Sequence, residues 1–296
     1  MTIRTAVPED AEAVAALRRT VFPYLLMSAA QVRRAIADSP PAERFAGWVT
    51  VSGDELVGWG SCGLNTWTSE PGIGTLNVYV HPEHRMRGLG GTLLDAAEGH
   101  LAEIGVRRVQ TFVTQDSVAF AAGRGYEPNR EMHYASVDLR NLPEQPPTPP
   151  DVTLVPVSGV GPRPMYVADA AVSLDEPSDA PADAIEYDAW LHEIWNGPMI
   201  DHDLSVAAMV GGTVAAFSSV EVDGDRAWSG MTGTVRAHRG RGLAKLVKSV
   251  ALRRAAAAGI VSASTSNDDR NGPMLAVNDW LGYRRVATHL GVTRDL

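Results

Sequence analysis

The sequence predicts an α/β protein built from two similar domains in tandem. The first observation is a repeated pattern, His-Arg-x-Arg-Gly-Leu followed by Gly or Ala, at residues 84–90 and 238–244. The second is a proline-rich run at residues 141–151, which suits a semi-rigid extended linker better than a helix or a central strand. The third is that the strand and helix signals after this run repeat the order of those before it. We therefore expect domains over residues 1–140 and 152–296.

The first half alternates strand signals with amphipathic helix signals. Pro8 and two acidic residues open a first helix, Ser28 is a suitable N-cap for a second, and Gly105 ends a third. The expected helices are 8–21, 29–37, 89–104 and 116–122. Runs rich in β-branched and apolar residues predict the strands 3–6, 45–51, 56–64, 75–80, 108–113 and 132–139.

The second half carries the same signals in the same order. Gly211 and Gly212 form the hairpin turn between its second and third strands. The expected strands are 152–155, 203–210, 213–222, 227–235, 260–265 and 288–292. The expected helices are 165–173, 183–195, 243–258 and 273–280. Each half thus reads strand, two helices, three strands, helix, strand, helix, strand, as a duplicated domain would.

Each copy of the repeated pattern follows a strand and precedes a helix. In the second copy Thr232 and Thr234 favour an extended backbone, and Gly240 and Gly242 permit a tight turn before the helix. Backbone N–H groups at the N-terminus of a helix bind anions, and the neighbouring arginines add positive charge. Each loop therefore predicts a phosphate-binding site.

The two loops resemble motif A of the GNAT superfamily, the acetyl-CoA-dependent N-acetyltransferases. Its signature, Arg or Gln followed by x-x-Gly-x-Gly/Ala, matches residues 85–90 and 239–244. The resemblance covers nearly the whole chain, twice. It implies that each domain is a mixed, mostly antiparallel twisted sheet flanked by helices. The chain is similar to tandem GNAT enzymes such as mycothiol synthase, in which one domain is catalytic and the other chiefly structural or binding.

The resemblance also implies which residues bind acetyl-CoA. In the family the loop amides hold the pyrophosphate of coenzyme A, and the strand before the loop splays from its neighbour, so that its free backbone groups bind the pantetheine arm. An Asn after the fifth strand also contacts the coenzyme. Tyr79 serves either this site or the packing. The implied cofactor-binding residues are Val78, Tyr79, Val80, Arg85, Met86, Arg87, Gly88, Leu89, Gly90, Gly91, Thr92, Thr232, Gly233, Thr234, Arg239, Gly240, Arg241, Gly242, Leu243, Ala244, Asn267 and Asn271.

The resemblance leaves the general acid and base open. The family often places a Tyr as general acid in a short helix, where this chain has Ala121 in the first half and Asn278 in the second. Asn278 either donates a hydrogen bond to the reacting groups or lies on the helix surface. Many members use a Glu near the strand before motif A as the base. Glu221 is the candidate in the second half, unless it is a solvated residue of its acidic hairpin, whereas the first half offers only Asn77.

These differences predict a division of labour between the domains. We expect both to bind acetyl-CoA, the second to be catalytic through Glu221 and Asn278, and the first to be degenerate in catalysis. The expected function is transfer of an acetyl group to a primary amine of a small molecule. The alternatives are an acetyl-CoA-binding regulatory or structural module without turnover, and an enzyme that transfers another acyl group.

The composition of the chain limits the classes of partner that it is expected to bind. The net charge of −9 argues against nucleic acid, whose binding depends on Lys and Arg. No apolar run reaches the roughly 18 residues that a membrane helix needs. The single cysteine, Cys62, excludes an internal disulfide and favours a cytoplasmic protein. We expect no metal ion, and a monomer or homodimer.

An acidic segment points to the acceptor. No Lys or Arg occurs between Arg163 and Arg226. In the family the first two helices form one wall of the acceptor cleft, here Met165–Trp195, and we expect no cation to neutralise its carboxylates. Such a wall predicts a cationic acceptor, although solvated helix faces would look the same. Trp190 and Trp195 serve either stacking on that acceptor or core packing. The carboxylates of the segment are Asp169, Asp175, Glu176, Asp179, Asp183, Glu186, Asp188, Glu193, Asp201, Asp203, Glu221, Asp223 and Asp225.

Overall fold

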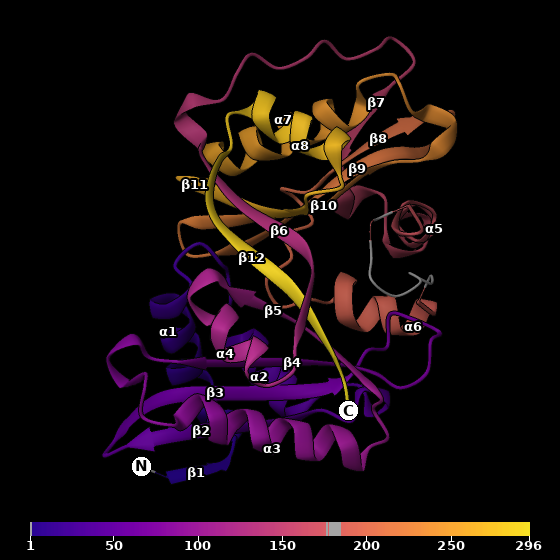
Figure 1. The fold of residues 1–296 in the computed structure, drawn as a ribbon. Coiled ribbons are helices and arrows are strands. Elements are labelled where there is room, and N and C mark those ends of the chain that lie inside the picture. Colours follow the sequence, from indigo (N-terminus) through magenta and orange to yellow (C-terminus); the bar gives the residue numbers. More distant parts are fainter. Residues whose placement is uncertain (1, 176, 178–184) are drawn as a thin grey trace. The chain divides into compact units, whose positions relative to one another are not determined.

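The computed structural model describes residues 2–175, 177 and 185–296 and divides into two compact units (Figure 1). The first unit comprises Met1–Met132 and Thr288–Leu296, and the second comprises His133–Ala287. Within the described residues, no helix combines the length and apolar character needed to cross a bilayer.

The sheet of the first unit has the strand order β1-β2-β3-β4-β5-β12-β6. Strands β1 to β4 are antiparallel neighbours, β4 and β5 are parallel, and β12 is antiparallel to β5. Its elements are β1 (Thr2–Thr5), α1 (Ala11–Val21), α2 (Ala29–Ala37), β2 (Ala46–Ser52), β3 (Glu55–Leu64), β4 (Ile73–Val80), α3 (Leu89–Glu103), β5 (Arg108–Thr114), α4 (Val118–Ala122), and parts of β6 (Glu127–Asp138) and β12 (Arg284–Asp295).

Helices cover both faces of this sheet. Leu76 and Tyr79 of β4 lie on opposite faces, because side chains alternate along a strand. Leu76 packs in one cluster with the buried α3 residues Leu94, Ala97 and Leu101, while Tyr79 packs with α1 and α2. The expected N-cap of α2 is confirmed, since the Ser28 hydroxyl accepts a hydrogen bond from the Gln31 N–H at 3.1 Å.

The second unit repeats this design with the strand order β12-β6-β11-β10-β9-β8-β7 (Figure 1). Its remaining elements are β7 (Thr153–Pro156), α5 (Pro162–Ser173), α6 (Tyr187–Trp190) with a π-helical turn (Leu191–Trp195), β8 (Val206–Val210), β9 (Thr213–Asp223), β10 (Arg226–Thr234), α7 (Leu243–Ala257), β11 (Ser262–Asp268) and α8 (Gly272–Leu281). The mixed, mostly antiparallel sheets flanked by helices confirm the predicted fold class. The start of the helix expected at residues 183–195 lies outside the described residues.

Two apolar clusters define the faces of the second sheet. Ala208 and Val220 pack with the buried residues of α7, whereas Ala207 and Phe217 pack with α5 and Trp190. We call these the α7 face and the α5 face. The alternation of neighbours such as Ala207 and Ala208 follows directly from the period of a strand.

The unit boundaries differ from the expected domain limits at residues 140 and 152, which both fall inside the second unit. The chain enters that unit within β6 and leaves it within β12. The last residues of β12 pair with β5, from His289 opposite Thr114 to Asp295 opposite Arg108. Local sequence patterns show that a strand exists but not which strand it pairs with, because pairing is set by contacts distant in sequence.

Candidate functional site

In both units two parallel strands begin as neighbours and then separate. Among the described residues, β4 and β5 pair only over Ile73–Thr75, and β10 and β11 only over Arg226–Trp228. Just beyond the last pair, a threonine hydroxyl of the second strand donates a hydrogen bond to a backbone carbonyl of the first strand. The Thr111 hydroxyl donates to the Leu76 carbonyl at 2.6 Å, and the Thr265 hydroxyl to the Ser229 carbonyl at 2.9 Å. The separated strands leave backbone groups available to a ligand.

The glycine loops that follow these strands share one geometry. Arg85 donates from Nε to the Val80 carbonyl at 3.3 Å, and Arg239 donates to the Thr234 carbonyl at 3.1 Å. Gly88 and Gly242, each the residue before a helix, have φ of +83° and +74°, a region that favours glycine. In the part of the chain that the structure describes, no side chain caps either helix N-terminus. The first N–H groups of α3 and α7 therefore stay available for an anion.

A β-bulge distinguishes β10 from β4. The register of β9 and β10 shifts by one residue between Ser229 and Thr232, so that Gly230 and Met231 together stand opposite Ser219. Strands β3 and β4 keep one register throughout. A bulge leaves an extra residue out of the ladder and re-aims nearby groups. The bulge therefore adds unpaired backbone beside the separated strands of the second unit.

A cavity of about 710 Å³ surrounds this bulge in the second unit. It reaches from the glycine loop past the separated strands to α8. Its walls include Val172 and Glu221 from the α5 face and Lys245 and Lys248 from α7. The cavity therefore has lining residues from both faces of the sheet at the gap between β10 and β11.

Most second-half residues predicted for the coenzyme line this cavity. They are Thr232, Gly233, Thr234, Arg239, Gly240, Gly242, Leu243, Ala244, Asn267 and Asn271. Arg241 lies apart from it and donates to the Asp151 carboxylate at 2.6 Å. Asn271 also serves the fold, because its side chain accepts from the Met274 N–H at the start of α8.

The two catalytic candidates occupy different positions. Glu221 lies opposite Trp228 at the cavity wall, and burial raises the pKa of its carboxyl group to about 6. Asn278 is buried behind the wall, where its amide donates to Asn267 at 2.5 Å. Glu221 thus faces the space that a substrate would fill, whereas Asn278 orients Asn267.

Sequence reasoning missed Lys248, which lines the cavity although its side chain is only 1% exposed. Its ammonium lies 5.2 Å from the centre of the Tyr283 ring. Burial lowers its pKa to about 7. The internal repeat contained the signal, since Lys248 stands six residues after Gly242, as the buried Leu94 does after Gly88.

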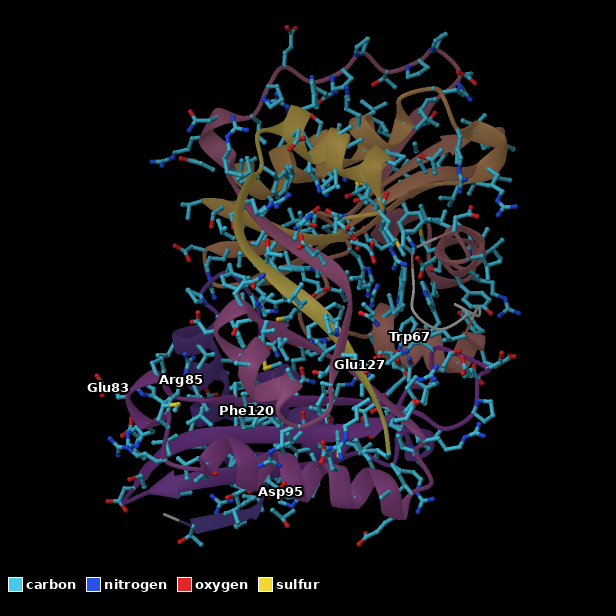
Figure 2. The ribbon with its side chains drawn as sticks, in the orientation of Figure 1. Trp67, Glu83, Arg85, Asp95, Phe120 and Glu127 are labelled. Atoms are coloured by element: carbon cyan, nitrogen blue, oxygen red, sulfur yellow. The ribbon has the colours of Figure 1, made fainter. Side chains whose placement is uncertain are left out.

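The predicted residues of the first unit lie in the same loop and strand as their counterparts. Figure 2 shows Glu83 and Arg85 in the loop before α3 and Phe120 on α4. Met86 adopts φ of +59° and is fully exposed, and Arg87 donates to the Glu83 carbonyl at 3.0 Å. The predicted set also includes Val78, Val80, Leu89, Gly90, Gly91 and Thr92, of which Val80 and Leu89 pack in the core.

The Tyr79 side chain of the first unit packs in the core. Its side chain is 5% exposed, and its ring meets Phe22 edge-on at 5.7 Å between centres. Tyr24 and His289 extend this aromatic cluster. At the matching position of the second unit stands Gly233, where an added Cβ would lie 2.1 Å from Val172. Aromatic rings thus fill the α1 side of β4.

The acidic segment is partly neutralised, contrary to expectation. Asp175 pairs with Arg236 and Arg239, which follow the segment in sequence and hold the pKa of that carboxyl well below its usual range. Asp169 is buried and accepts from the Trp190 indole N–H at 2.6 Å. Glu176, Asp179 and Asp183 lie outside the described residues.

Comparisons with known proteins agree with this geometry. Residues 12–126 match the model of the Acetyltransferase (GNAT) family. A mycothiol acetyltransferase from Catenulispora acidiphila is 28% identical over 94% of this chain and 88% of its own length. The structure of a tandem GNAT protein from the clavulanic acid biosynthesis pathway covers 99% of this chain and 98% of that one, with a TM-score of 0.77 and 21% identity. A GCN5-related N-acetyltransferase from Sphaerobacter thermophilus covers 99% and 95%, with a TM-score of 0.73 and 21% identity.

The family match falls on the first unit, and the relatives of similar length span both units. The internal repeat extends the same loop and the same separated strands to the second unit. Together these likenesses support a tandem GNAT protein, and the activity named for the relatives is acetyl transfer.

Proposed function

We propose that the second unit transfers an acetyl group from acetyl-CoA to a primary amine of a small molecule. The observation that carries this proposal is the cavity that joins the glycine loop, the bulged strand and Glu221 in one space. A phosphate site, free backbone donors and a carboxylate of raised pKa are the groups that acyl transfer to an amine requires.

The residues present fit coenzyme A. The available N–H groups at the start of α7 suit its pyrophosphate, with Arg239 beside them. The backbone of β10 from Gly230 to Thr234 suits the pantetheine arm. When bound, acetyl-CoA supplies the activated acetyl group as a thioester.

Glu221 is the proposed general base. A protonated amine must lose a proton before its nitrogen can attack a carbonyl carbon. A carboxylate with a pKa of about 6 is ionised at neutral pH, yet more basic than an ordinary glutamate. N–H groups at the bulge would face the negative charge that develops on the carbonyl oxygen. The new C–N bond forms as the C–S bond breaks.

The acceptor in this proposal is cationic before it reacts. The Glu221 carboxylate inside the cavity attracts such an amine. The acidic segment attracts a cation less strongly than its composition suggests. Asp169 is buried, and Asp175 already has two arginine partners. In this proposal one ammonium group on the acceptor is enough for its recognition by Glu221.

The test is turnover of acetyl-CoA with a panel of amines, measured as release of free thiol. We expect turnover with primary amines and a Michaelis constant for them that rises with salt. Calorimetry on the same protein measures acetyl-CoA binding separately. Binding without turnover of any amine would favour a regulatory acetyl-CoA-binding module, and no binding at millimolar acetyl-CoA would contradict the proposal.

A further inference from the structure

The α7 face of the cavity carries a buried lysine, Lys248. Lys248 is 1% exposed, and within the part of the chain that the structure describes no carboxylate pairs with it. Its ammonium lies over the face of the Tyr283 ring. A lysine held this way is costly to bury unless something binds it.

Two buried hydroxyl groups beside it also lack hydrogen-bond partners, namely Ser229 Oγ and Tyr283 Oη. Burial raises the pKa of the Tyr283 phenol, and the nearby Ser229 hydroxyl offsets part of that effect, although the two groups do not meet hydrogen-bond geometry. Both hydroxyls therefore remain available as donors. Buried polar groups in folded proteins are rarely left unsatisfied, so each requires an explanation.

These groups mark the inner end of the cavity. Ser229 is the first residue of β10 beyond its last pair with β11, and Thr265 bridges the strands there. The glycine loop lies at the other end of β10. If coenzyme A is anchored at the loop, as the proposed function requires, its acyl end points toward Ser229.

We infer that this inner end is a subsite for a carboxylate carried by the acyl group. The second unit then accepts, beside acetyl-CoA, acyl-CoA esters whose acyl chain ends in a carboxylate. Lys248 would pair with that carboxylate, and Ser229 would donate a hydrogen bond to it. The transfer itself is unchanged. The amine nitrogen forms the bond to the acyl carbon, the C–S bond breaks, and the thiolate takes up the proton that the nitrogen loses and leaves as the thiol.

The carboxylate belongs to the donor rather than the acceptor because of the faces involved. Glu221 lies on the α5 face, where it alternates with Val220 of the α7 face cluster. Lys248 lies on the α7 face. An amine that approaches Glu221 and an acyl tail that reaches Lys248 occupy opposite sides of the sheet.

The first unit shows what the position looks like without this subsite. Leu94 stands at the place of Lys248 and is 4% exposed in an apolar cluster. Leu76, whose carbonyl accepts from Thr111 as that of Ser229 does from Thr265, belongs to the same cluster. An apolar pair therefore satisfies the scaffold, so Lys248 and Ser229 are not needed to hold the fold.

The experiment compares succinyl-CoA with acetyl-CoA as donors to one amine. We expect Lys248→Met to lower the ratio of their kcat/KM values by about 10- to 100-fold, the loss typical of a buried charged contact. Ser229→Ala should lower it by about 3- to 10-fold. The control is Lys245→Met, one turn earlier on the same cavity wall, which should change both donors alike.

A second measurement is independent of turnover. Calorimetry in buffers of different ionisation enthalpy counts the protons taken up when succinyl-CoA binds. At pH 8 the wild type should take up about one proton more with succinyl-CoA than with acetyl-CoA, because a lysine of pKa about 7 is mostly neutral there. The other titratable groups on the cavity wall are Asp175, Glu221, His238, Arg239 and Lys245, and subtracting the acetyl-CoA value removes their shared response.

Three results would overturn the inference. The first is an unchanged donor ratio in Lys248→Met, and the second is equal proton uptake with both donors. The third is a Lys248→Met effect confined to amines that carry a carboxylate, which would assign the subsite to the acceptor. Failure of the proposed function looks different, because then either neither donor would bind or both would bind without turnover.

Discussion

Around the separated strands the first unit carries leucines where the second carries polar groups. Leu76 and Leu94 pack together, whereas Ser229 and Lys248 border a cavity. The scaffold beneath is the same in both, down to the arginine that donates to the last carbonyl of its strand. The fold therefore does not need the polar groups, so their presence in one copy indicates a functional role.

A buried tyrosine gives the same comparison. In the first unit the Tyr126 hydroxyl donates to Glu98 at 2.8 Å. In the second unit Leu252 stands where the repeat places Glu98, and the Tyr283 hydroxyl has no hydrogen-bond partner among the described residues. One copy satisfies its buried donor internally, whereas the other leaves it available.

The base position differs as well. Glu221 stands opposite Trp228, and its counterpart Gly63 stands opposite Thr75. A Cβ added to Gly63 would lie 2.8 Å from the Glu43 carbonyl oxygen, so the first unit has no room for a side chain there. Without a carboxylate, a bulge or an open α1 side, the first unit suits coenzyme binding or structural support.

The largest expected effect is a difference in activity between matched substitutions in the two glycine loops. Gly242→Glu should reduce kcat/KM by about 1000-fold, because it forces a side chain into φ of +74° and sets a negative charge where phosphate binds. Gly88→Glu is the matched change at φ of +83°, with the space around its Cβ equally open. It should leave most of the thiol release intact. Equal losses from the two substitutions would show that the units are not specialised.

The next largest effect is expected from exchanging the residue types at Leu94 of α3 and Lys248 of α7. Leu94→Lys should lower the free energy of unfolding by about 3 kcal/mol or more, because the first unit offers a buried lysine only apolar neighbours. Lys248→Leu should instead raise it by about 1 to 3 kcal/mol. Urea unfolding followed by circular dichroism measures both.

The stability of the wild type should also depend on pH through Lys248. A lowered pKa in the folded state means that the unfolded chain binds more protons above pH 7. Stability from this group therefore rises with pH between about 7 and 10, and Lys248→Leu should remove that rise. A rise that persists in the variant would assign it to other groups.

Removing the base should cost less than removing the phosphate site. Glu221→Gln should lower kcat by about 100-fold while acetyl-CoA binding persists. In the wild type, kcat/KM should fall as pH drops below about 6, because protonation of Glu221 removes the base, and the variant should lack this limb. A pH profile that is the same in both proteins would exclude Glu221 as the base.

The smallest expected effect is on the free energy of unfolding, from the residue with positive φ in each glycine loop. Met86 holds φ of +59° where the second loop has Gly240 at +76°. Met86→Gly should raise the free energy of unfolding by about 0.5 to 1 kcal/mol, since glycine adopts this region without strain. Gly240→Met should have the opposite sign. Thermal unfolding of both variants checks the pair.

The sequence predicted the parts of the fold that local chemistry decides. Ser28, Gly88, Gly105 and Gly242 mark helix ends through their own side chain or their permitted φ, so these ends were found almost to the residue. The glycine loops were found for the same reason, and most second-half residues assigned to them line the cavity.

The missed features depend on partners distant in sequence. Asp175 appeared unneutralised because its arginines follow Arg226 in the chain. Asn278 appeared available because its partner Asn267 belongs to another element. The bulge in β10 depends on the register with β9, which no single strand reveals. Lys248 carries no local signal of burial, which follows only from its match to the buried Leu94 in the repeat.

The final residues of β12 have a consequence for biosynthesis. They form a strand of the first unit, pair with β5, and are held by ion pairs from Arg108 to Asp295 and from Arg294 to Glu98. On the ribosome, residues 1–132 emerge long before this strand is synthesised. During that time the edge of β5 lacks its partner strand. An unpaired edge invites pairing with other chains. We expect the first unit to complete its folding only after the second has been synthesised, and its folding to be slowed by this long-range contact.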